Sequence, residues 1–141
     1  MSALSRHRKV RAARERLASR FGDEATKRLA AKFAYELPAV EAVTKVADVI
    51  RLPDRDETVD PWPVPTPEDV DDALLAVSGA RVQLLVDEET LIQAALANGR
   101  SWVQIGKMLG LSEAVAEARP EAIRRAIADL TQRDPGSITW R

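Results

Sequence analysis

Residues 101–119 carry the clearest structural signal in the chain, and they read SWVQIGKMLGLSEAVAEAR. Trp102, Ile105 and Leu109 recur at the spacing that places side chains on one face of a helix. Gly106 adds a small residue to the same short helix, which allows a second helix to approach closely. The first half of this stretch therefore predicts a short helix with one packed face.

The second half predicts a turn and a second helix. Gly110 can adopt the left-handed conformation that ends a helix, and Leu111 is placed to plug the turn. Ser112 is a preferred N-cap for the helix that follows. The inward side of that helix would be Val115 and Ala116.

The whole stretch resembles the helix-turn-helix DNA-binding proteins of high-GC bacteria, whose motif runs roughly G-x-S-W-x-x-I-G-x-x-L-G-V-S before a recognition helix. The resemblance covers about Asp87 to Arg119. The matching residues are Gly99, Ser101, Trp102, Ile105, Gly106, Leu109, Gly110, Ser112, Ala116 and Arg119. The resemblance implies a DNA-binding role in which the second helix lies in the major groove.

The solvent-facing positions of this second helix depart from the family pattern. They are Glu113, Ala114, Glu117 and Ala118, where the family usually offers Arg, Gln or His to base edges. Because these positions lack the usual base-reading side chains, the sequence predicts weak selectivity among DNA sequences. The two carboxylates would also repel phosphate.

Pro120 is a second departure, since it stands where the family usually has an aromatic residue. A proline cannot donate a backbone hydrogen bond, and it disfavours the helical conformation in the residue before it. We therefore expect a recognition helix of about two turns. A separate last helix is expected over residues 121–133, with Ile123, Ile127 and Leu130 facing inward.

Positive charge is concentrated at the N-terminus. Residues 1–32 hold ten Lys or Arg against three acids, whereas residues 33–99 hold four against fourteen. Residues 2–20 predict a basic helix with a narrow apolar stripe. The stripe consists of Val10, Ala13, Leu17 and Phe21. This helix could be an arm that lies along phosphates, a solvated helix face, or a partner for the chain's own acidic middle.

Two further helices are expected before the middle of the chain. Glu24 to Leu37 would form one helix, packed through Leu29, Phe33 and Leu37. Ala39 to Leu52 would form the next, although its β-branched content also fits a strand. Its inward face would be Val40, Val43, Ala47 and Ile50.

Residues 53–66 form a Pro-rich acidic linker, PDRDETVDPWPVPT, which cannot be a helix or a central strand. Alternating prolines favour an extended conformation around Trp62. Trp62 would dock within the chain or, like Trp140 in the tail, contact a partner protein.

Thr66-Pro67-Glu68-Asp69 is a strong helix start, and the helix that follows is expected to continue to Ala97. A 3-4 repeat of apolar residues continues through Gly79, interrupted by Arg81 and Glu88. Its apolar members are Val70, Leu74, Val77, Leu84, Leu91 and Ala95. A helix this long must pack against the N-terminal helices or against a second copy of itself.

Composition limits the function classes. With 45% apolar and 30% charged residues, the chain is typical of a soluble globular protein, and we expect it in the cytoplasm. It has no cysteine and one histidine, His7, which stands among cations. No phosphate-binding loop, catalytic triad or metal-ligand spacing is present, so we expect no enzyme activity, cofactor, metal, small-molecule substrate or membrane association.

The sequence thus predicts an all-α, dimeric protein that binds duplex DNA as a regulatory or accessory factor. The alternative is a scaffold protein in which the helix-turn-helix is a packing module. The expected units are residues 1–52, the linker 53–66, a helical domain 67–133 with the motif at 101–119, and the tail 134–141. The candidate DNA contacts are Arg6, Arg8, Lys9, Arg11, Arg14, Arg16, Arg100, Ser101, Gln104, Lys107, Ser112, Glu113, Ala114, Glu117, Arg119, Arg124 and Arg125.

Overall fold

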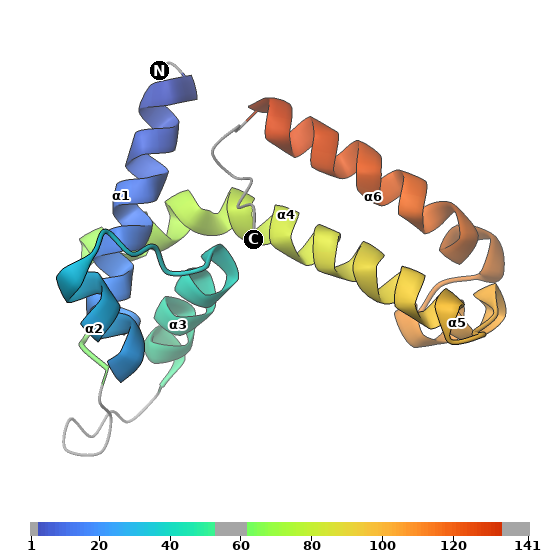
Figure 1. Ribbon diagram of the computed structural model, residues 1–141, viewed down its shortest axis with the longest axis horizontal. Coiled ribbons are helices and arrows are strands. Elements are labelled where there is room, and N and C mark those ends of the chain that lie inside the picture. The colour runs from blue at the N-terminus through green and yellow to red at the C-terminus, as the bar shows by residue number, and fades with distance from the viewer. Residues whose placement is uncertain (1–2, 53–61, 134–141) are drawn as a thin grey trace.

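The computed structural model describes residues 3–52 and 62–133, and all regular elements in these ranges are α-helices. They are α1 (Ala3–Phe21), α2 (Glu24–Lys32), α3 (Ala39–Arg51), α4 (Pro67–Ala97), α5 (Trp102–Leu109) and α6 (Glu113–Arg133). The all-α prediction is confirmed. Helix α4 is the long axis of the molecule, with α1 to α3 at one end and α5 at the other (Figure 1).

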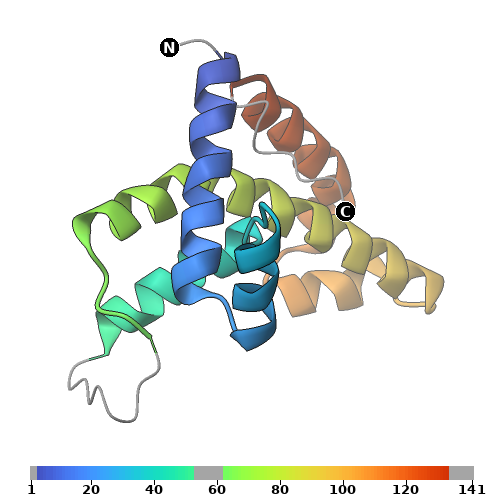
Figure 2. The ribbon, with the colours of Figure 1, turned by 60° about the vertical axis from the view of Figure 1, so that its left-hand side comes forward.

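A first group of buried residues, here called the N-terminal core, joins α1, α3 and the first half of α4. Leu17 and Phe21 of α1, Val46 of α3 and Ala76 of α4 are at most 2% exposed. Helix α1 crosses over the first half of α4, and α3 packs along α4 below this crossing (Figure 2). The basic N-terminal helix is thus a structural part of this core, because its predicted apolar stripe is buried from Val10 to Phe21.

Helix α2 ends earlier than the sequence predicted. It stops at Lys32 instead of Leu37, and Phe33 is 67% exposed. Two tertiary contacts hold Leu37 in a non-helical segment, because its backbone N–H donates to Arg14 O and its carbonyl accepts from Arg14 Nε. Pro38 acts in the same direction, since a residue before proline avoids the helical conformation.

Helix α3 confirms the predicted helix but turns a different face inward. The buried side chains are Ala39, Ala42, Val46 and Val49, whereas Ile50, predicted inside, is 55% exposed. Each buried residue comes one position before the corresponding residue of the predicted inward face. Alanines at this face allow α3 to lie close to the alanine-rich face of α4, and this close packing decides which side is buried.

Helix α4 is continuous, as predicted, and begins with the expected cap. Thr66 Oγ1 accepts from Asp69 N at 3.2 Å, and the Asp69 carboxylate accepts from Thr66 N at 2.9 Å. The N-terminal helices cover the small residues of α4, including Ala73, Ala76, Gly79 and Ala80. They leave the predicted leucine stripe uncovered: Leu74, Leu84 and Leu91 are 65%, 59% and 70% exposed.

A second group, the C-terminal core, joins the other half of α4 to α5 and α6. Its buried centre is Ile92, Ile105 and Ile123, with Leu85 and Trp102 packed against it. Helix α6 runs back along α4 from α5 (Figure 1). Helix α4 therefore belongs to both cores, and the N-terminal core contains residues from both sides of the predicted linker.

Helix α6 corrects the prediction at Pro120. The helix is unbroken from Glu113 to Arg133, with the proline inside it, so the expected two-turn helix and separate last helix are one element. Tertiary contacts stabilise the helix around the proline. Pro120 is itself buried, Ile123 is fully buried, and Arg119 forms two hydrogen bonds to Glu88 of α4.

Candidate nucleic-acid interface

The corner between α5 and α6 has the turn that the sequence predicted. Ser101 caps α5 through a reciprocal pair of hydrogen bonds with Gln104, at 3.2 and 2.9 Å. Gly110 adopts a left-handed conformation, with φ 70° and ψ 30°, and ends the helix. Ser112 Oγ then accepts from Val115 N at 3.3 Å and caps α6.

Gly106 is the point of closest approach within this corner. A Cβ atom at this position would lie 2.6 Å from the backbone oxygen of Leu111 and 3.4 Å from the Cβ of Ala116. The first distance is far below a normal contact, so only glycine fits without moving the turn. Ala116 is buried as predicted, whereas Val115, also predicted inside, is 51% exposed.

The outward side of α6 next to the turn is acidic. Glu113, Ala114, Glu117 and Ala118 are all exposed, as the sequence predicted, and Glu121 extends the acidic surface by another turn. The polar residues predicted to contact DNA are partly engaged within the chain, because Ser101, Gln104 and Ser112 form the helix caps.

Three arginines of α6 are paired with acids of the same chain. Arg119 Nε lies 2.7 Å from Glu88 Oε2, and Arg124 Nε lies 3.0 Å from Glu89 Oε1. Arg125 pairs with Glu121 on its own helix. Arg100 and Lys107, by contrast, are exposed and form no ion pair with any residue that the structure describes.

Most of the candidate arginines on α1 are also paired internally. Arg11 lies 3.3 Å from Glu36, and Arg16 donates two hydrogen bonds to Asp72 of α4, at 3.0 and 2.7 Å. Arg14 is only 6% exposed and donates to Leu37 O, so it cannot lie along a phosphate backbone. Burial lowers the pKa of Arg14, and the nearby Glu36 carboxylate partly offsets this effect.

Three further cations stand at the start of α1 and are exposed or partly exposed. Arg8 and Lys9 are exposed and form no ion pair within the described ranges, and Arg6 is partly exposed. The start of α1 and the α5–α6 corner lie at opposite ends of the molecule (Figure 1). The two groups of cations therefore do not form one continuous basic surface.

Two buried carboxylates that the sequence reasoning overlooked join α1 to α4. Asp69 accepts two hydrogen bonds from Arg20, at 2.7 and 2.8 Å, and Asp72 accepts two from Arg16. Burial acts to raise the pKa of Asp69, but hydrogen bonds from Arg20 and Thr66, together with the Arg20 charge, hold it below its usual value. Residue spacing could have indicated these contacts. Asp69 and Asp72 are three residues apart and Arg16 and Arg20 are four apart, so each pair lies on one face of its helix.

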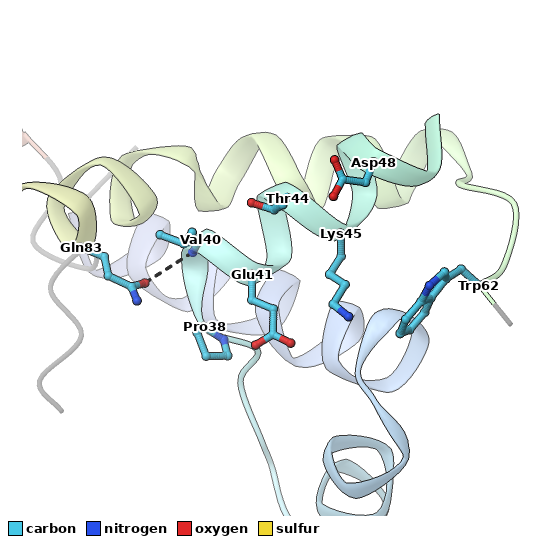
Figure 3. Close-up of a pocket in the computed structure, with 8 residues that line it drawn as sticks. All are labelled: Pro38, Val40, Glu41, Thr44, Lys45, Asp48, Trp62 and Gln83. Carbon is cyan, nitrogen blue, oxygen red and sulfur yellow. Dashed lines mark hydrogen bonds between the residues drawn. The ribbon is translucent and has the colours of Figure 1, made fainter. Parts of the chain in front are cut away.

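Trp62 docks against the N-terminal core. Its ring is partly buried, with Lys45 Nζ 4.2 Å and Lys27 Nζ 5.8 Å from the ring centroid. It borders a pocket of about 560 Å³ beside α3, which also includes Glu41 and Gln83 (Figure 3). The intramolecular docking predicted for Trp62 is thus present, while Trp140 and the tail 134–141 lie outside the described residues.

An apolar groove of about 510 Å³ runs between α4 and α5 on the C-terminal core. Leu84, Leu91, Met108 and Leu109 form its exposed walls, with exposed fractions between 37% and 70%. Ile92 and Ile105 form its floor. Within the described ranges, no three His, Cys, Asp or Glu side chains gather as metal ligands, and no helix is long and apolar enough to cross a membrane.

No protein-family model, curated protein or solved structure matches this chain. The DNA-binding role that the helix-turn-helix resemblance of residues 87–119 implies therefore stays a prediction.

Proposed function

We propose that this protein is a non-enzymatic, cytoplasmic DNA-binding protein that contacts duplex DNA through the α5–α6 corner with weak sequence selectivity, as an accessory or regulatory factor. The observation that carries the proposal is the close approach of the two helices at Gly106, followed by the left-handed turn at Gly110. This arrangement presents the first turns of α6 outward, which is the surface that helix-turn-helix proteins insert into the major groove.

Electrostatics supports the weak selectivity. Glu113 and Glu117 stand where direct base readout would use Arg, Gln or Asn, and no described cation pairs with them. Arg100 and Lys107 border the corner and are available for phosphate contacts, which give affinity without sequence information. Arg8 and Lys9 lie at the far end of the molecule. They could contact DNA phosphates only at a separate point on the duplex.

The test is a titration of fluorescent duplex DNA of random sequence at several salt concentrations. Replacing both Arg100 and Lys107 by Ala should weaken binding and flatten the plot of log affinity against log salt by about 0.9 for each phosphate that is no longer neutralised. The matched control replaces Arg28 and Lys32 by Ala, because these α2 residues are exposed, lie in the N-terminal bundle and remove the same charge. Equal losses of affinity in both variants would contradict an interface at the corner.

A second candidate function is a protein-interaction module, and one observation favours it. Arg11, Arg16, Arg119 and Arg124 are each paired with a carboxylate of the same chain, which reduces the positive charge available for phosphate. Absence of DNA binding even at low salt would favour this candidate over the first.

A further inference from the structure

The uncovered stripe of α4 has the spacing of a coiled-coil seam. Residues 70, 74, 77, 81, 84, 88, 91 and 95 alternate steps of four and three, and apolar side chains occupy six of these eight positions. Leu74, Leu84 and Leu91 on this stripe are more than half exposed. In this structure the N-terminal helices cover the other face of α4 and α6 covers a flank, so nothing described packs over the leucines.

We propose that this seam, together with the groove beside α5, binds a second copy of the same chain, with the two α4 helices antiparallel. The proposal goes beyond DNA binding and does not depend on it. A seam with a 3-4 repeat is complementary in spacing to another seam with the same repeat, and a twofold axis supplies that partner without a second gene product.

The charged residues of the seam favour an antiparallel pair of α4 helices. Arg81 and Glu88 are the two charged residues on the seam, and they stand one heptad apart. A parallel pair would place Arg81 against Arg81 and Glu88 against Glu88, which is unfavourable. An antiparallel pair with Leu84 opposite Glu88 and Leu91 opposite Arg81 brings each arginine within one layer of the other copy's glutamate, twice by symmetry.

The rest of the fold is compatible with this direction. The antiparallel arrangement sends the two N-terminal bundles to opposite ends, and in this register Val77 of one copy lies opposite Ala95 of the other, beside the groove that Met108 borders. Met108 is 66% exposed and would be covered by the second copy. Glu88 keeps its bond to Arg119 and is still 28% exposed, so it can accept from a second arginine.

The first test is the mass of the purified full chain by sedimentation equilibrium. We expect a dimer of the 15.5 kDa chain, and we expect Leu84→Glu and Leu91→Glu to be monomers with unchanged helical content. Val86→Glu is the matched control, because Val86 is 45% exposed on the same helix outside the seam, and it should remain dimeric. A wild-type monomer at every accessible concentration would overturn the proposal, as would a dimer that survives both leucine substitutions.

The second test reads the direction, using the absence of cysteine from the chain. Arg81→Cys and Leu91→Cys should form a mixed disulfide when the two variants are combined and oxidised, and each alone should crosslink far less. Efficient crosslinking of each variant with itself would show a parallel pair and overturn the antiparallel arrangement.

Discussion

Gly110 shows how one residue fixes the corner. Its φ of 70° lies in the region that side-chain-bearing residues rarely adopt, although nothing stands within 4 Å of the place that a Cβ atom would take. Gly110→Val should therefore destabilise the protein through backbone strain alone, by about 1 to 3 kcal/mol in the free energy of unfolding. Chemical denaturation followed by circular dichroism measures this change. Ala118→Val, on the exposed side of α6, should cost much less, and equal destabilisation would contradict the register of the corner.

Asp69 gives a second prediction, about pH. Because its folded pKa is depressed, its contribution to stability is present above the unfolded pKa of about 3.9 and is lost as pH falls through the folded value. Asp69→Asn should cost about 1 to 3 kcal/mol at pH 7, by weakening the hydrogen bonds from Arg20, and the difference from wild type should shrink below about pH 4. Denaturation at a series of pH values measures it. Asp71→Asn, at an exposed position on the same helix, is the matched control and should cost much less at pH 7.

The acidic first turn of α6 gives a third prediction, on what the α5–α6 corner binds. If it enters a DNA groove, the double variant Glu113→Gln, Glu117→Gln should tighten binding to random duplex by about 1 kcal/mol at low salt, because two carboxylates near phosphates are removed. Replacing Glu24 by Gln and Asp71 by Asn makes the same charge change far from the corner and should have a smaller effect. An affinity for DNA that does not change, together with loss of a bound protein in a pull-down, would support the interaction module instead.

At the level of elements, the sequence predicted best where the signals are local. The caps at Thr66 and Ser112 and the turn at Gly110 were correct because each depends on residues within one turn. The continuous helix α4 was also correct, since its strong start and unbroken periodicity outweigh one interior glycine.

Predictions that depended on tertiary contacts were less accurate. The inward face of α3 was wrong by one residue, because its choice depends on which neighbouring surface carries alanines. The break expected at Pro120 is absent, because burial of the proline and the Arg119–Glu88 pair stabilise the helix around it. No pattern in a single sequence states these contacts.

At the scale of the whole molecule, the charge asymmetry of the sequence is largely satisfied within the fold. The basic α1 meets the acidic start of α4 through Arg16 with Asp72 and Arg20 with Asp69. Of the alternatives open at the sequence level, pairing with the acidic middle is therefore present for these arginines. The predicted division at residues 53–66 stays a prediction, since α4 beyond it contributes to the same core as α1 and α3.

The shared helix α4 has a consequence for folding. It supplies Ala76 to one core and Ile92 to the other, with no break between them. Most of the stability of a helix in a protein comes from tertiary packing, so each half of α4 depends on packing that the other half helps to hold in place. Loss of either core would leave the rest of α4 to fray toward the other, and we expect the two cores to gain and lose their order cooperatively.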